Sequence, residues 1–125
     1  MKLVVVSGHK SFDKLKPTIR RVAGFLAKKL KQEKAYLEVY LVGREFMYKN
    51  VLAFPAPKGF PRPDIIRKPL GEIYLNPIYI KENGEDVTFM FIHGFLHLLG
   101  YDHKRRNDRI RMEKREQELL SLLSH

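Results

Sequence analysis

The sequence predicts a single α/β domain with one apolar helix buried at its centre. Four short stretches carry the patterning of β-strands, and two longer ones repeat apolar residues at helical spacing. The run from Val87 to Leu99 is apolar on nearly every face, which is typical of a helix in the middle of a fold. The chain has 125 residues, 44% of them hydrophobic, enough for one core and too few for two ordinary domains. One domain over residues 1–125 is therefore expected.

The four strand segments are marked by β-branched or alternating residues and by the turn residues around them. Leu3 to Val6 is a β-branched run closed by Ser7-Gly8, and Ala35 to Val42 alternates apolar and polar residues. Asn50 to Phe54 ends at a proline, and Gly71 to Asn76 ends at an Asn-Pro pair. Proline and glycine at these points interrupt the chain as expected between strands.

Two amphipathic helices are expected to flank the buried one. The first has Pro17 in its opening turn, and its apolar residues from Ile19 to Leu30 recur three to four positions apart. The second, from Asn107 to Ser121, is highly charged, and we expect Glu116 to pair with basic neighbours on its solvated face. One isoleucine and four leucines are expected to dock this helix: Ile110, Leu119, Leu120, Leu122 and Leu123.

A long proline-rich loop is expected before the fourth strand, over residues 55–69. Loops of this length in a compact domain are often functional. Both a lid or wall that holds a nucleic-acid strand and a plain proline-stiffened excursion fit the composition. The basic residues that favour the first interpretation are Lys58, Arg62, Arg67 and Lys68.

The chain is strongly basic, with 24 lysines and arginines against 14 acidic residues and a net charge of +10. A small protein with this imbalance attracts polyanions such as RNA, DNA or an acidic membrane surface. The alternative is a lysine- and glutamate-rich surface of the kind found in heat-adapted proteins. The absence of cysteine excludes disulfides and thiolate zinc sites and fits a reducing compartment.

We find no segment long enough to be the apolar core of a signal peptide or a membrane-spanning helix. Leu3 to Val6 is too short for the apolar core of a signal peptide, and Val87 to Leu99 is too short to cross a bilayer. We therefore expect a cytoplasmic protein with no membrane partner.

Three histidines stand at the end of the buried helix. His93 and His97 are four positions apart, so on a helix they share one face. Gly100 lies where the helix would end, since glycine tolerates the left-handed conformation found there, and the turn can bring His103 to the same point. Three histidine ligands and an open fourth position are typical of catalytic zinc, whereas structural sites are closed by four protein ligands. We predict one Zn²⁺ per chain, bound by His93, His97 and His103.

The spacing of these histidines is that of the metzincin zinc proteases with one change. Those proteases place their general base, a glutamate, directly after the first histidine, and here that residue is Gly94. Asp102, beside the third histidine, is either a base or a group that fixes a histidine ring. Met112 either lies under the metal, as a methionine does in metzincins, or packs in the core.

The stretch from His93 to His103 resembles the signature of the YbeY family of bacterial endoribonucleases. It has the sequence His-Gly-x-Leu-His-Leu-x-Gly-Tyr-Asp-His. Asn50 to Pro55 (Asn-Val-Leu-x-Phe-Pro) and Gly71 to Ile73 (Gly-Glu-Ile) resemble two further motifs of that family, in the same order. Met112 and Glu116 match a methionine and a glutamate of its C-terminal helix, so the resemblance covers nearly the whole chain.

The resemblance implies a single domain with a four-stranded mixed sheet, a central metal-binding helix and flanking helices. It also implies a zinc-dependent endoribonuclease that cleaves single-stranded RNA, matures the 3′ end of the 16S rRNA and takes part in ribosome quality control. The small ribosomal subunit would be its partner, and we expect a monomer. The family has an arginine facing the metal cleft before the Asn-Val-Leu motif, and Arg44 is the nearest candidate, one residue out of register.

Three functions are left open. The resemblance implies hydrolysis of single-stranded RNA at a three-histidine zinc. Asp102 and, through the resemblance, Arg44 are then the candidate catalytic groups, because an arginine near the metal stabilises charge on a phosphorane. A zinc peptidase is the second, disfavoured by the missing glutamate. The third is a ribosome-associated, RNA-binding factor in which the metal is structural.

Overall fold

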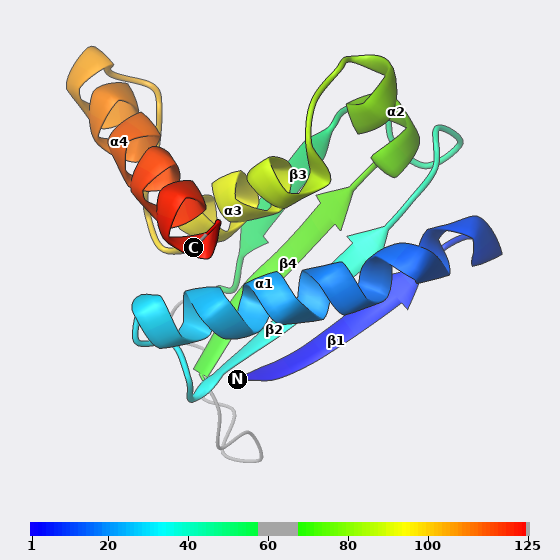
Figure 1. Ribbon diagram of the computed structural model, residues 1–125, viewed down its shortest axis with the longest axis horizontal. Coiled ribbons are helices and arrows are strands. Elements are labelled where there is room, and N and C mark those ends of the chain that lie inside the picture. Colours follow the sequence, from blue (N-terminus) through cyan, green and yellow to red (C-terminus); the bar gives the residue numbers. More distant parts are fainter. Residues whose placement is uncertain (58–67, 125) are drawn as a thin grey trace.

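The described residues, 1–57 and 68–124 of the computed structural model, form a four-stranded mixed sheet with helices packed on one face (Figure 1). The strands are β1 (Lys2–Ser7), β2 (Ala35–Leu41), β3 (Val51–Pro55) and β4 (Lys68–Leu75). They lie in the order β1-β2-β4-β3; the first three run parallel, and β3 pairs antiparallel with β4 at the edge. The prediction of a mixed sheet with flanking helices is confirmed.

The helices are the 3₁₀ helix η1 (Lys10–Leu15), α1 (Lys16–Lys29), α2 (Pro77–Glu82), α3 (Val87–Leu98) and α4 (Arg106–Leu123). α1 carries the chain from β1 to its parallel neighbour β2, a connection that parallel pairing requires. α3 lies over β3 and β4, and both α1 and α4 contact it (Figure 1). In the part of the chain that the structure describes, no helix combines the length and apolarity needed to cross a membrane.

The core lies between the helices and the covered face of the sheet. α3 begins after its N-cap residue Asp86, whose carboxylate accepts a hydrogen bond from the backbone N–H of Phe89 at 3.3 Å. Phe91 and Phe95 of α3 are fully buried and meet edge to face, which confirms the prediction of a buried helix. β2 contributes to this core the residues that the alternation selects: Ala35, Leu37, Val39 and Leu41.

β4 begins at Lys68, three residues before the strand predicted from Gly71. The early start continues the parallel pairing with β2, because Lys68 is the register partner of Ala35. Of the basic residues proposed for a lid or wall, Lys58, Arg62 and Arg67 lie outside the described residues, and Lys68 belongs to the strand.

α4 docks through a face that differs in part from the expected one. Met112 and Glu116 are buried on it, whereas Ile110 and Leu122 are 51% and 49% exposed. The expectation that Glu116 lies on the solvated face is wrong: only 3% of it is exposed. Three of the expected docking residues do pack against the core: Leu119, Leu120 and Leu123.

Candidate metal centre

The end of α3 turns the chain back on itself as the glycine predicts. The backbone N–H of Gly100 donates to the carbonyl of His97, and that of Tyr101 donates to the carbonyl of Leu96, each at 3.1 Å. These two bonds form a Schellman motif, which needs a left-handed residue after the helix. Gly100 supplies it with a φ of +101°. The segment that follows returns beside the helix and brings His103 to the other two histidines.

The three predicted ligands converge on one point. The Nε2 atoms of His93 and His97 are 3.2 Å apart, and His103 also offers a nitrogen, with the three ligand atoms all within 4.8 Å of one another. Two nitrogens bound tetrahedrally to one zinc at roughly 2.0–2.1 Å would lie about 3.3 Å apart. The spacing of His93 and His97 therefore fits a metal ion without rearrangement of the helix.

Glu116 of α4 fixes the orientation of His93. Its Oε1 lies 2.9 Å from His93 Nδ1, and because an ionised carboxylate only accepts, the imidazole donates from Nδ1. In the neutral ring this hydrogen bond leaves the lone pair of Nε2, which faces the metal position, available to a metal ion. A carboxylate on the distal nitrogen of a ligating histidine is the usual way in which proteins fix its ring and raise its basicity.

The surroundings of His97 favour the neutral form of its imidazole. Burial, and then the charges that His93 and His103 carry when protonated, keep the pKa of His97 below its usual 6.5. A neutral imidazole is the form that binds a metal ion. The environment of α3 thus favours the ligating form of this residue.

Met112 fits both interpretations that the sequence left open. It is 1% exposed within the core, and it also lines the pocket that holds the histidines. A methionine that fills the space under a metal site and joins the core does both with one side chain.

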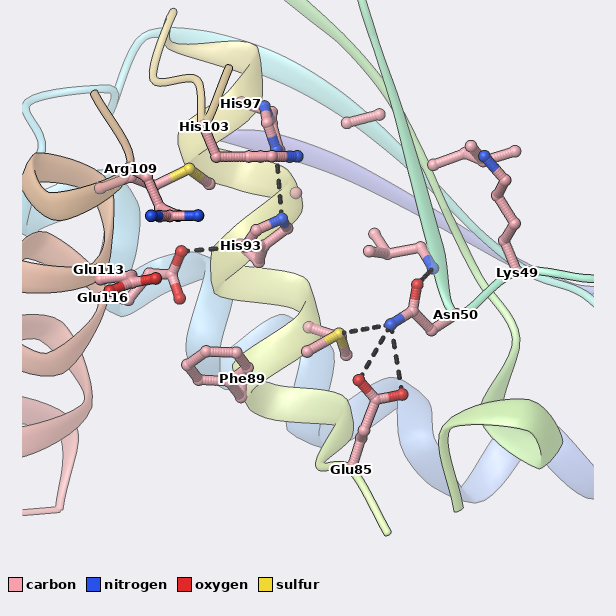
Figure 2. Close-up of a pocket in the computed structure, with 16 residues that line it drawn as sticks. Lys49, Asn50, Glu85, Phe89, His93, His97, His103, Arg109, Glu113 and Glu116 are labelled. Carbon is pink, nitrogen blue, oxygen red and sulfur yellow. Dashed lines mark hydrogen bonds and ion pairs between the residues drawn. The ribbon is translucent and has the colours of Figure 1, made fainter. Parts of the chain in front are cut away.

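The histidines open into a pocket of about 650 Å³. α3 forms its floor, the edge strand β3 one wall and α4 the other (Figure 2). The wall from α4 carries Arg109 and Glu113, and the far end is formed by Asn50 and Glu85. Solvent and an extended substrate can therefore reach the metal position, and His103 is itself exposed.

Gly94 explains why a protease-like base is missing. A Cβ built at this position would lie 3.1 Å from the Cγ2 methyls of both Val51 and Ile73, which belong to β3 and β4. Distances this short are tighter than most real Cβ contacts, so any side chain at position 94 would require these two methyls to shift by a few tenths of an ångström. Glycine avoids that crowding and lets α3 pack closely on the sheet.

The other two predicted site residues, Arg44 and Asp102, make their polar contacts with groups other than the three rings. Arg44 forms an ion pair with Glu82 at the end of α2, and it is not among the residues that line the pocket. Asp102 Oδ1 accepts a hydrogen bond from the backbone N–H of Lys104 at 2.5 Å and so holds the turn that leads to and from His103. The structure thus brings the three histidines together but does not bring Arg44 to them.

Arg109, Asn50 and Glu85 were not singled out as site residues. Asn50 Nδ2 lies 3.2 and 3.1 Å from the two carboxylate oxygens of Glu85, which are 35 positions away in sequence. No local pattern could reveal that pair. Glu116 did have a signal, because Met112, Glu116 and Leu119 repeat at helical spacing and form one face.

The sequence of this chain matches one family of known proteins. The model of the family described as "Endoribonuclease YbeY" matches residues 8–124. Relatives with that name are found in Sulfurovum sp. (33% identical, covering 54% of this chain and 51% of the relative) and Nitrobacter hamburgensis (37% identical, covering 59% and 44%). Another occurs in Helicobacter pylori (34% identical, covering 53% and 51%). The chain spans about half the length of the curated relatives it matches.

A solved structure shares the fold. The solution structure of a Thermotoga maritima protein superposes with a TM-score of 0.55 at 22% sequence identity, over 98% of this chain and 91% of that one. At this identity the similarity supports the arrangement of sheet and helices and nothing finer.

Proposed function

Because the chain belongs to the endoribonuclease YbeY family, we propose that it is a zinc-dependent endoribonuclease that cleaves single-stranded RNA. The proposed role is maturation of ribosomal RNA, at the 3′ end of the small-subunit molecule, with a part in ribosome quality control. The family relationship supports the reaction class, and the features of the pocket support the metal and the substrate.

The observation that carries the proposal is the convergence of three imidazoles at the base of an open pocket. His93, His97 and His103 supply three nitrogens and leave a position free toward the pocket, as in catalytic zinc sites. A zinc ion bound there would supply Lewis-acid activation of water and of the phosphodiester. A purely structural metal would instead be expected in a closed site with four protein ligands.

Arg109 is the cation best placed to contact the reacting phosphate. Its side chain projects from α4 into the pocket near His103 (Figure 2), and no hydrogen bond or ion pair to another described residue holds the guanidinium elsewhere. A guanidinium donates two parallel hydrogen bonds to phosphate oxygens and stabilises the charge that develops on them. We assign this role to Arg109 in place of Arg44, whose guanidinium is engaged by Glu82.

Glu116 and Asp102 act through the ligands. Glu116 holds His93 in the tautomer that ligates through Nε2, and Asp102 secures the turn beside His103. Neither supplies the general base in this proposal. The proton of the attacking water passes to solvent or to the substrate.

The substrate class follows from charge and shape. A net charge of +10 attracts a polyanion, and a hollow about 650 Å³ in volume admits splayed nucleotides of a single strand. We further propose that the protein works as a cytoplasmic monomer on the small ribosomal subunit.

The test compares His97→Ala with His9→Ala. His97 is a proposed ligand, whereas His9 is exposed in the loop after β1, where it accepts a hydrogen bond from the backbone N–H of Ser11. Bound zinc, measured by elemental analysis, and cleavage of an unstructured RNA should both be lost in His97→Ala and kept in His9→Ala. A chelator should abolish cleavage by the native protein, and added zinc should restore it.

Two other outcomes would contradict this proposal and support a different function. RNA binding that survives zinc removal, with no cleavage in fresh zinc, would indicate an RNA-binding factor with a structural metal. Zinc-dependent turnover of casein without cleavage of RNA would indicate a peptidase, against which the packing of Gly94 already argues.

A further inference from the structure

The pocket extends well beyond the three histidines. At its far end, near the start of α3, it is lined by Asn50, Glu85, Phe89 and Met90. Pockets of 300–1,000 Å³ hold ligands larger than a single phosphate group, and this one has a volume of about 650 Å³. A nucleotide whose phosphate lies at the metal position therefore has room for its base toward Glu85.

The side chain of Asn50 is held by other residues of the protein, and it in turn positions the Glu85 carboxylate. Its Oδ1 accepts from the backbone N–H of Val51 at 2.7 Å, and its Nδ2 faces Glu85 and the sulfur of Met90 at 3.1–3.2 Å. Both polar atoms of the amide are thus used within the protein. The Glu85 carboxylate, which it holds in place, keeps acceptor capacity, since two oxygens offer about four lone-pair positions.

The negative charge of Glu85 would not be expected in a pocket that binds only phosphate groups. No lysine or arginine of the described residues forms an ion pair with it, and a carboxylate without a cationic partner repels the RNA backbone. Carboxylates in nucleic-acid sites accept hydrogen bonds from the amino groups of bases. The chemistry that Glu85 can recognise is therefore the donor edge of a nucleobase.

Phe89 adds an aromatic surface to the same end of the pocket. It is half-buried, and Figure 2 shows its ring on the α4 side of α3, with the Glu85 carboxylate on the β3 side. Bases of single-stranded RNA stack on such rings whatever their identity. Phe89 can thus contribute affinity for any base, and Glu85 can contribute the choice between bases.

We propose that Glu85, held by Asn50, forms a base-binding subsite that selects guanine next to the cleaved phosphodiester; the assignment rests on the proposed ribonuclease function. Guanine presents two adjacent N–H donors on its Watson–Crick edge, which match two carboxylate oxygens. Adenine and cytosine present one amino group each. Uracil presents one N–H between two carbonyl oxygens, which the carboxylate repels.

The experiment uses Glu85→Gln and, as a matched control, Glu113→Gln. Glu113 also lines the pocket, from α4, and Figure 2 shows it on the opposite side of α3 from Asn50 and Glu85. Glutamine at position 85 keeps an acceptor for Asn50, and thermal melts verify that both variants fold. Two readouts are taken: the base composition around cuts in a randomised single-stranded RNA, and the relative affinity for guanosine and uridine 5′-monophosphates by calorimetry.

The native protein should bind guanosine monophosphate about tenfold or more tighter than uridine monophosphate, the range expected for hydrogen bonds to a charged group. Guanine should be enriched at one fixed position beside the cut. Both preferences should fall severalfold or more in Glu85→Gln and persist in Glu113→Gln. Phe89→Leu should weaken both nucleotides to a similar extent and leave their ratio unchanged.

The two proposals fail in different ways. Cleavage of RNA with no base preference, or a preference that Glu85→Gln retains, overturns the subsite and leaves the nuclease. A guanosine preference that depends on Glu85, in a protein that cleaves no RNA, supports the subsite and overturns the nuclease.

Discussion

The contact between Glu116 and His93 should set the affinity of the metal site. It joins Oε1 and Nδ1 at 2.9 Å, and the glutamate side chain is only 4% exposed, so the hydrogen bond is shielded from bulk solvent. Loss of such a partner typically weakens metal binding by about 10–100-fold. Glu116→Gln keeps an acceptor oxygen and removes the charge, so we expect about a tenfold loss, or 1.4 kcal/mol. Glu116→Ala also removes the hydrogen bond, and we expect a loss of about 100-fold.

The assay is competition for zinc between the protein and a chromogenic chelator. Glu113→Gln serves as the control, because this substitution removes a similar charge from the same wall of the pocket, and no hydrogen bond joins Glu113 to a histidine among the described residues. Its zinc affinity should stay within about twofold of the native value, as for surface charges that interact weakly. The reasoning is refuted if Glu116→Gln binds zinc as tightly as the native protein, or if Glu113→Gln loses as much.

Three further predictions test other parts of the site. Arg109→Gln should lower kcat for RNA cleavage by about 10²–10³-fold with little change in bound zinc, while Arg44→Gln should not; equal effects would remove Arg109 from its assigned role. Gly100→Ala should destabilise the protein by about 1–2 kcal/mol in chemical denaturation, because φ there is +101°, and should also weaken zinc binding by displacing His103. The metal-free protein should lose stability as the pH falls below the usual histidine pKa of 6.5, because the lowered pKa of His97 in the folded state lets the unfolded chain bind more protons. Chemical denaturation at about pH 5 and about pH 8 should give a lower free energy of unfolding at the lower pH, and the difference should be smaller in His97→Ala.

The metal site could be predicted from the sequence because its geometry is mostly local. His93 and His97 share a helix face through their four-residue spacing, and Gly100 marks the turn that returns His103. The buried helix was predictable for a related reason, since a run that is apolar on every face has no solvent-exposed side. Neither inference needs knowledge of what the rest of the chain does.

The groups that tune the site come from distant segments, and sequence spacing does not place them. Glu116 is 23 positions from His93, and its charge favoured a solvated position over the buried one that it occupies. A buried carboxylate needs a partner, and His93 is that partner. The position of Arg44 was equally hidden, because its ion pair with Glu82 depends on how the segment after β2 meets the end of α2.

The packing of Gly94 links the fold to the chemistry. With position 94 pressed against Val51 and Ile73, α3 can supply ligands to the metal but no side chain beside the first ligand to act as a base. The polar groups that face the histidines must therefore come from another element, and α4 provides them as Glu116 and Arg109. One is an acceptor that fixes a ligand, and the other is a cation suited to a phosphate. A site equipped in this way favours a substrate that brings its own negative charge, which an RNA backbone does and a peptide does not.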